Sequence, residues 1–417
     1  MAERRVSIIQ TIWYVLRNGL GGGGGIAYKG ALVGLALMAF YGLYLWAFIQ
    51  QAPVLLGSSA GGMITTAMSD SVPWGLYISF FIFWVGIAAA GIVFGIAAYV
   101  FSHPGFERIA VLAEAQAIAA LVIALLLVFV DVGRPLRTMI LIPQLPNFPS
   151  SMLDWDFLVL TTYLVLNIIA YLYTVKRGLE GLKPSKTFER IFIVIAAPFA
   201  IGIHTVTAFI SQALIARPYW NSPLLAPRYV ATAFASGPAL LLLLLLAAEH
   251  YLGFKVDEDV YRKTVYVIAG SLVVGLYFTL SEAQEILWYV TEPLKLQQAS
   301  TIYYGYYTWW LGLMFWLWVI LGSLAVLLTL SPRVRSTRIG LLAIALLTLV
   351  GVVCEKTLTI VVPAFTPNPL GQIVPYTPTP LEIMVTLGVH ALGLIVYLAL
   401  ALPAIKLMEV NVHHESS

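Results

Sequence analysis

The chain has 417 residues, of which 60% are hydrophobic and only 10% charged, and its mean hydropathy is +0.90. This composition lies outside the range of soluble domains and predicts an all-α, polytopic membrane protein. The single cysteine, Cys354, excludes an internal disulfide and a four-cysteine iron–sulfur cluster held by this chain alone. A net charge of +3 is too small to indicate a nucleic-acid partner.

The first 29 residues form a segment that precedes the expected membrane domain. Arg4 and Arg5 are followed by a short apolar stretch ending at Arg17, and no small-residue cleavage site precedes the glycines at 21–25, so we expect the segment to be retained. Its apolar side consists of Ile8, Ile9, Ile12, Val15 and Leu16. Such a helix can lie flat on the membrane surface; a frayed tail is the alternative.

Ten windows of about 20 mostly apolar residues follow, which is the length that a helix needs to cross hydrocarbon. They lie near 30–50, 77–101, 107–130, 156–175, 190–213, 231–252, 264–286, 308–330, 338–362 and 382–406. We expect a membrane domain over 30–406, with two four-helix bundles at about 77–213 and 231–362, two peripheral helices and a tail at 407–417. The interval from Asp131 to His204 equals that from Glu282 to Glu355, which favours duplicated bundles over coincidence.

The basic residues predict the orientation of the spans. One set of alternate connections, which includes both termini, holds 17 of the 23 Lys and Arg residues. Because positively charged loops stay in the cytoplasm, both termini are expected there. With this orientation, most of the ionisable residues within or next to spans converge on the outer leaflet.

His204 is the first candidate functional residue, since an ionisable side chain inside a span is costly and marks a site by default. In a helix, His204, Thr207 and Ser211 share one face and form a polar stripe that could hold a ligand carbonyl or a water chain. Hydrogen bonding between helices alone is the alternative.

Two further groups of polar residues lie at the outer ends of spans. Asp131 ends the third span and is followed by Arg134, so the two side chains can pair at the membrane boundary. Asp154 and Asp156 begin the fourth span, and one of them is expected to be only a helix cap. The aromatic residues at the same level that could line a ring are Trp74, Tyr77, Trp155 and Trp220.

These residue types suit proton-coupled chemistry on a quinone. Each quinone oxygen needs a proton donor or acceptor beside it, and the ring needs an apolar slot. His204 with Asp131 or Asp156 supplies such groups. The candidates for a proton path are Glu114, Glu282, Glu285 and Glu355, and pairing with Arg108 is the alternative for Glu114.

Several stretches resemble the NrfD/polysulfide-reductase family of membrane subunits. They are "PWGLYISFFIFWVGIAAAG" (73–91), "DVGRPLR" (131–137), "SSMLDWDF" (150–157), the run from His204 to Leu240, and "AFTPNPLG" (364–371). The chain is similar to the ten-span branch of that family, which includes HybB and Hmc-type subunits, and it resembles DsrP-type members most. A tyrosine that some ten-span members carry in the third span has no counterpart here.

The resemblance implies a subunit without its own haem, iron–sulfur cluster or metal, in a prokaryotic cytoplasmic membrane. It implies a site for menaquinol near the outer face, electron exchange with an extracytoplasmic ferredoxin-like iron–sulfur subunit, and further partners such as a b- or c-type cytochrome. His204, Asp131 with Arg134, and Asp154 or Asp156 match its functional positions, with Tyr77, Trp155, Thr207 and Trp220 around the ring. Glu285 resembles a family glutamate.

Two other functions remain open at this point. A proton-coupled secondary transporter also has many spans, a repeat and buried acids, although no pair of broken helices at the midplane is visible. A haem-carrying anchor could use His204 and His390, the histidines within spans on the outer side.

Overall fold

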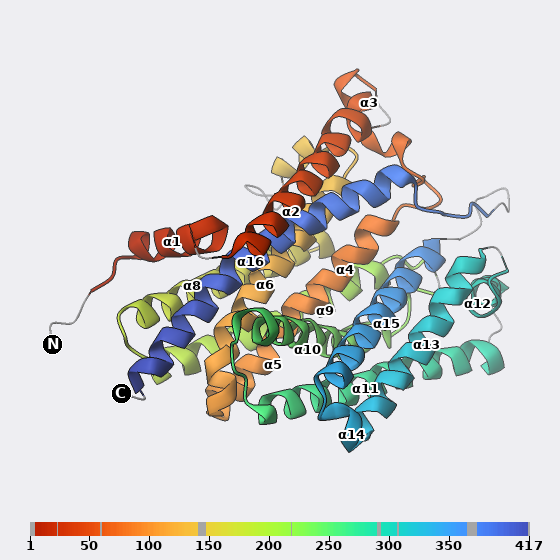
Figure 1. The fold of residues 1–417 in the computed structure, drawn as a ribbon. Helices are drawn as coiled ribbons and strands as arrows, with labels where there is room; N and C mark the ends of the chain where they lie inside the picture. Colours follow the sequence, from red (N-terminus) through yellow and green to blue (C-terminus); the bar gives the residue numbers. More distant parts are fainter. Residues whose placement is uncertain are drawn as a thin grey trace.

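The computed structural model describes residues 5–22, 24–58, 61–140, 147–217, 219–289, 293–306, 308–364 and 373–415. Within these ranges the regular elements are helices, without a strand (Figure 1). Ten of the helices are long and apolar enough to cross a membrane, so the predicted fold class and number of spans are confirmed. The stretch 364–371, used for the family resemblance, lies outside the described residues except for Ala364.

The spanning helices follow one another along the chain. They are α2 (Ile26–Leu45) continued to Gln50, α4 (Leu76–Ala89) continued through α5 (Gly91–Gly95) to Val100, α6 (Pro104–Asp131), α8 (Met152–Leu179), α9 (Lys186–Gln212), α10 (Leu225–Leu252), α11 (Glu258–Tyr289), α13 (Trp309–Leu330), α15 (Arg338–Ala364) and α16 (Pro380–Glu415). The shorter helices are α1 (Ile8–Arg17), α3 (Ala52–Leu55), α12 (Pro293–Tyr304) and α14 (Pro332–Arg335).

The spans pack as two groups of four and one additional pair. Helices α4, α6, α8 and α9 contact one another, as do α10, α11, α13 and α15, while α2 packs along α16 (Figure 1). Only 11% of the apolar window of α2 is buried, against 33–78% in the other spans, so α2 is a peripheral helix. Helix α16 also packs on α6 and is less peripheral than expected.

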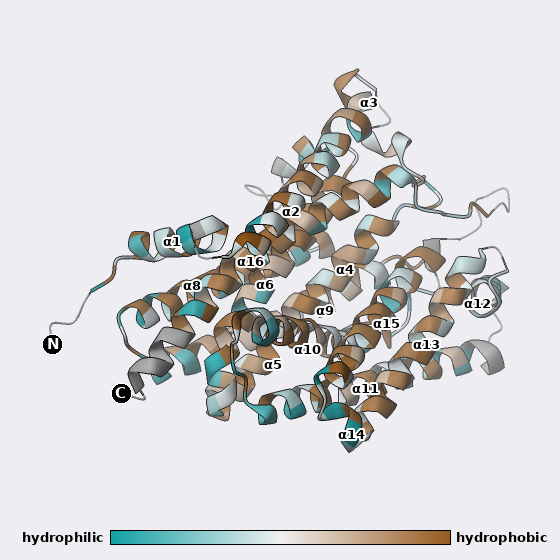
Figure 2. Ribbon diagram, viewed as in Figure 1, coloured by the Kyte–Doolittle hydropathy of each residue, from teal (hydrophilic) through white to brown (hydrophobic). Residues whose placement is uncertain are grey.

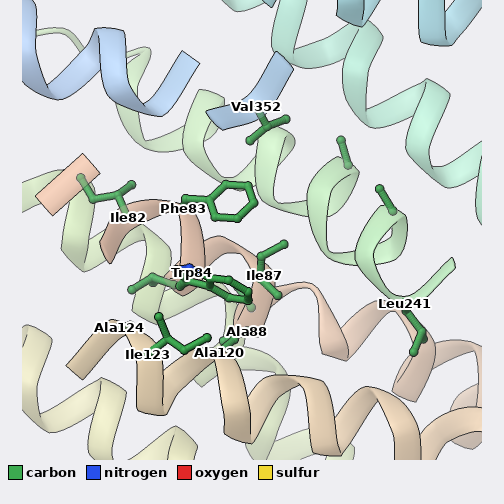
Figure 3. Close-up of a cluster of buried hydrophobic side chains, with 14 of the residues drawn as sticks. Ile82, Phe83, Trp84, Ile87, Ala88, Ala120, Ile123, Ala124, Leu241 and Val352 are labelled. Atoms are coloured by element: carbon green, nitrogen blue, oxygen red, sulfur yellow. The ribbon is translucent and has the colours of Figure 1, made fainter. Parts of the chain in front are cut away.

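Helix α4 lies at the centre and joins the two groups, since it contacts α6, α9, α10 and α15. Figure 3 shows side chains of α4, including Phe83, Trp84 and Ile87, packed among small residues of α6 and against Leu241 and Val352 of the second group. Small residues at these contacts let helices approach closely, which is the usual source of association energy in lipid.

Apolar residues cover the lengths of the spans, and hydrophilic residues gather toward their ends and connections (Figure 2). Large side chains such as Leu37, Val194 and Leu327 are exposed on the outside of the helix assembly. In water such a surface would be an aggregation liability, but in lipid it is the expected solvent-facing side.

The N-terminal segment contains the predicted helix. Ser7 caps α1 through a capping box with Gln10, and Thr11 and Val15 face the protein. The helix is fixed near the ends of two spans, because the Val6 N–H donates to Glu180 Oε1 (3.1 Å) and α1 also contacts α16. Its large apolar side chains face outward, as expected of a helix that lies on a membrane surface.

Candidate functional site

Helix α9 carries the polar stripe predicted around His204. The side chains of His204, Thr207 and Ser211 are 0%, 2% and 1% exposed, so one face of the helix turns all three toward the protein. Lipid contacts the other side of α9, where Ile201 and Phe209 are exposed. The prediction that these three residues share a buried face is therefore confirmed.

The two aspartates of α8 have different roles. Asp156 is buried and accepts a hydrogen bond from Thr207 Oγ1 (2.7 Å), which ties α8 to α9. Asp154 belongs to the start of the helix: its N–H donates to the cap Ser151 (3.2 Å), and its Oδ2 accepts from the Asn147 N–H (3.0 Å). Asp156 is thus the carboxylate next to the stripe.

The imidazole of His204 lies between α4 and α10. Its ring centre is 5.2 Å from that of Tyr229, and a Cβ added to Gly86 would be 3.3 Å from Cε1 and Nε2 of the ring. Neither ring nitrogen has a hydrogen-bond partner of good geometry among the described residues. Gly86 is nine residues below Tyr77 in α4, so His204 lies roughly 14 Å deeper than the outer end of that helix.

Four buried charged residues meet beside this histidine, and we refer to them as the charged quartet: Arg228 of α10, Glu282 of α11, and Glu355 and Lys356 of α15. Arg228 pairs with Glu282, and its Nε lies 3.1 Å from Glu355 Oε1. Lys356 Nζ lies 3.1 Å from Glu355 Oε2. Two cations and two anions balance one another, as charges buried in a membrane span must.

Tyr229 connects His204 to the charged quartet. The Nζ atom of Lys356 lies 3.8 Å from the centre of the Tyr229 ring and donates to Thr232 Oγ1 (2.7 Å). The ring of Tyr229 therefore contacts a cation and the neutral or charged imidazole of His204. The hydroxyl of Tyr229 is buried without a hydrogen-bond partner among the described residues.

Asp131 belongs to a separate polar cluster at the outer end of the first group. It ends α6 beside Gln50, whose Nε2 donates to the Val130 carbonyl (2.8 Å) and whose Oε1 accepts from the Tyr77 hydroxyl (2.8 Å). One oxygen of Asp131, Oδ1, is buried without a hydrogen-bond partner among the residues described. The expected placement of Asp131 next to His204 is not found, because the two side chains differ in depth and neighbours.

Glu382 of α16 completes this outer cluster. Its Oε1 accepts from the Tyr376 hydroxyl (2.7 Å), and its Oε2 accepts from the backbone N–H groups of Thr379 (2.8 Å) and Ala67 (3.1 Å). The Tyr376 hydroxyl also accepts from the Leu76 N–H (2.9 Å). Burial and the Glu382 carboxylate raise the pKa of Tyr376, so this hydroxyl stays protonated and keeps donating.

The predicted ion pair between Asp131 and Arg134 is wrong. After Asp131 the backbone leaves the helix in an extended conformation at Val132 (ψ 123°), which carries Arg134 away from the carboxylate. Its guanidinium instead donates to the Ser58 carbonyl (2.9 Å). Arg134 therefore helps to hold the outer connection between α3 and α4.

The aromatic residues predicted to line a ring do not form one wall. Trp155 donates from Nε1 to the Pro149 carbonyl (2.9 Å) and packs on Phe148 with 4.7 Å between ring centres. Trp220 is fully buried, donates to the Thr359 carbonyl (2.8 Å) and packs on Trp74. Trp220 thus lies beside the charged quartet, through a residue one turn from Glu355.

The four glutamates proposed for a proton path are also dispersed. Glu282 and Glu355 are in the charged quartet, and Glu285 is exposed at the outer part of α11. Glu114 is buried in the first group, where its Oε1 accepts from the Tyr99 hydroxyl (2.8 Å) and its Oε2 has no hydrogen-bond partner among the described residues.

His390 is held by two hydrogen bonds that use both ring nitrogens. Trp84 Nε1 donates to Nε2 (2.8 Å), so Nδ1 carries the proton and donates to the Thr386 carbonyl (2.7 Å). This arrangement does not fit an axial haem ligand paired with His204. The described residues also contain no cluster of three or more His, Cys, Asp or Glu that could hold a metal ion.

Sequence reasoning missed Arg228, which is central to the charged quartet. The predicted sixth span began at 231 and left Arg228 in a loop, whereas α10 begins at Leu225 and contains it. An arginine close to a long apolar run was the available signal, because intramembrane arginines are rare and paired. Glu382 was missed for the same reason, at the start of α16.

Comparisons with known proteins place this geometry in a family. The family model described as "Polysulphide reductase, NrfD" matches residues 65–367, which include α4 to α15 and nearly all the polar residues described above.

Three curated relatives are similar over most of the chain. A putative dimethyl sulfoxide reductase membrane subunit of Halobacterium salinarum is 27% identical over 415 residues, covering 89% of this chain and 90% of its own. A selenate reductase subunit of Mesobacillus selenatarsenatis is 26% identical, covering 73% and 76%. An Hdr-like menaquinol oxidoreductase integral membrane subunit of Archaeoglobus fulgidus is 23% identical, covering 64% of each chain. With the family model matching well over half of its length, the chain belongs to the polysulphide reductase NrfD family.

Proposed function

We propose that this chain is the quinol-oxidising integral membrane subunit of a respiratory oxidoreductase complex. Menaquinol binds in the outer half of the membrane, and its electrons pass to an extracytoplasmic, ferredoxin-like iron–sulfur subunit. The names of the relatives support this proposal, since one is a menaquinol oxidoreductase subunit and the other two are subunits of reductases. A b- or c-type cytochrome is a further expected partner.

The observation that carries the proposal is the buried histidine whose ring nitrogens are available to a ligand. Oxidation of one quinol releases two electrons and two protons, so each hydroxyl needs a nearby acceptor. Both ring nitrogens of His204 lack partners among the described residues, and Thr207, one turn away, leads to the Asp156 carboxylate at 2.7 Å. We assign His204 as the first proton acceptor and Asp156 as the group that passes the proton toward the outer face.

The outer cluster has a supporting role in this proposal. Asp131 offers a buried oxygen without a partner among the described residues, and Tyr77 and Gln50 fix its surroundings. We assign Asp131 to proton release at the outer face, while Arg134 holds the adjacent connection. The resemblance of the run after His204 to DsrP-type proteins supports a role in sulfite or other sulfur-compound metabolism.

The test is a binding titration with a fluorescent quinol-analogue inhibitor on the purified complex. His204→Ala is expected to weaken binding at least about tenfold, roughly 1.4 kcal/mol, and His204→Gln should weaken it in the same direction. His250→Ala is the matched control, because His250 is an exposed histidine at the other end of α10 and should not affect binding.

Unchanged binding in both His204 variants would contradict the assignment and favour the transporter. A substrate-dependent flux through the protein in proteoliposomes would then identify a transporter directly. A visible spectrum of the reduced, purified chain with haem bands would instead support the haem-carrying anchor.

A further inference from the structure

A groove lies on the outside of the helix assembly where the two groups of spans meet. It lies between α9, α10 and α11, has a volume of about 570 Å³, and is open toward the side where lipid would be. This volume is within the range of about 300–1,000 Å³ that is usual for small-molecule sites. Thr205 of α9, Val230 and Phe234 of α10, and Val274 of α11 are among its lining residues.

The groove is hollow because small residues replace larger ones along α11. A Cβ added to Gly270 would meet no atom within 4 Å, so the space above this residue is empty of protein. Gly270 and Phe278 both line the groove and are eight residues apart, which gives a length of roughly 12 Å along the helix. Phe278 lies toward the outer end of α11, so the groove occupies the outer leaflet.

The lining selects for a hydrocarbon chain rather than a phospholipid. None of the lining residues is charged, so no ammonium or guanidinium group of the groove can bind a phosphate. One of its two hydroxyls, that of Thr205, already donates to the Ile201 carbonyl (2.8 Å). A chain that enters the groove must therefore have its polar end bound elsewhere.

The neighbouring residues indicate where that polar end binds. Thr205 follows His204 in α9, and Val230 follows Tyr229 in α10, so the groove and the imidazole are on opposite sides of the same helix turns. A ligand with a long apolar tail and a headgroup near His204 would have to leave the protein close to this groove.

We propose that the groove between α9, α10 and α11 holds the polyprenyl tail of the quinol whose headgroup is oxidised at His204. This inference rests on the proposed function and adds the part of the substrate that the polar residues do not bind. It predicts that the protein distinguishes quinols by tail length, because only a long tail reaches the groove.

The experiment compares two probes, a long-tailed menaquinol and its decyl-tailed analogue, on the complete complex. Gly270→Phe fills the groove without steric conflict, and it should raise the Kd of the long-tailed quinol at least about tenfold while that of the decyl analogue stays within about twofold. Ser271→Leu, a smaller obstruction, should change the Kd in the same direction. Gly34→Phe is the control, since a Cβ on this lipid-exposed helix also meets nothing within 4 Å.

Mass spectrometry of molecules that copurify with the complex separates the two sources of a hydrocarbon chain. Loss of menaquinone in Gly270→Phe, with phospholipid content unchanged, supports the proposal. Loss of a phospholipid with menaquinone retained would overturn it, as would equal Kd values in the Gly270 and Gly34 variants. If the wild-type complex bound neither quinol, the proposed function itself would fail, which differs from a failure limited to the groove.

Discussion

At the scale of single residues, the chain keeps its buried charges in balance. Arg228 contacts both Glu282 and Glu355, and Lys356 contacts Glu355, all within helices that cross the membrane. Removing one member of such a set leaves an uncompensated charge in a medium of low dielectric constant, which is far more costly than removing an exposed ion pair.

Arg228→Leu should therefore lower the stability of the protein by about 3–5 kcal/mol. Arg262→Leu, which removes an exposed partner of Asp259 in α11, should cost no more than about 1 kcal/mol. Thermal unfolding of the detergent-purified variants measures the difference. Equal melting temperatures for the two variants would show that the quartet does not stabilise the fold.

Glu114→Gln tests the proton path without changing the local hydrogen bond. The glutamine Oε1 can still accept from the Tyr99 hydroxyl, but the side chain no longer ionises. If Glu114 admits protons from the cytoplasm, uptake measured with a pH-sensitive dye in inverted vesicles should fall at least about tenfold. Unchanged uptake, as expected for the exposed control Asp257→Asn, would exclude Glu114 from the path.

At the scale of helices, small residues decide which spans touch. Gly42 of α2 and Gly388 of α16 meet so closely that a Cβ on either glycine would be 2.6 Å from the Cα atom of the other. The long pairing of α2 with α16 depends on this contact of two backbones, because α2 has few other neighbours.

Gly42→Leu should separate α2 from α16 and destabilise the protein by about 1–3 kcal/mol, the usual cost of overpacking. Gly34→Leu on the same helix should be neutral, because its Cβ meets no atom within 4 Å. Thermal unfolding again provides the comparison. A destabilised Gly34 variant with an unaffected Gly42 variant would contradict the packing seen here.

At the scale of the whole molecule, the distribution of basic residues predicts one orientation. Cysteine labelling with a membrane-impermeant maleimide tests it, because the native Cys354 is buried and should give little background. Leu136→Cys, at a position that is 80% exposed, should react in intact cells. Ser336→Cys, in the connection that includes α14, should react only after the membrane is opened, and the reverse pattern would invert the assignment.

The features that the sequence predicted correctly are those that depend on local composition. The ten spans follow from apolar windows, and the buried face of His204, Thr207 and Ser211 follows from helical periodicity. The predicted bundles over 77–213 and 231–362 agree with the observed contacts between helices, apart from the later start assigned to α10.

Contacts between distant helices could not be predicted in the same way. Arg228 is 54 residues from Glu282 and far from Glu355, and no local pattern links the three. The Asp131–Arg134 pair was a plausible local contact, but the extended residue Val132 separates the two side chains. Pairing across helices depends on how the spans are arranged, and this information lies in packing rather than in spacing.

The charged quartet has a consequence for the way the chain enters the membrane during synthesis. Arg228 and Glu282 belong to α10 and α11, which are consecutive and pack together, so this helical hairpin can insert with its charges already matched. Glu355 and Lys356 are adjacent within α15 and neutralise each other at 3.1 Å. Each unit that leaves the translocon can therefore be neutral, and the arginine needs to find Glu355 only when the finished helices assemble.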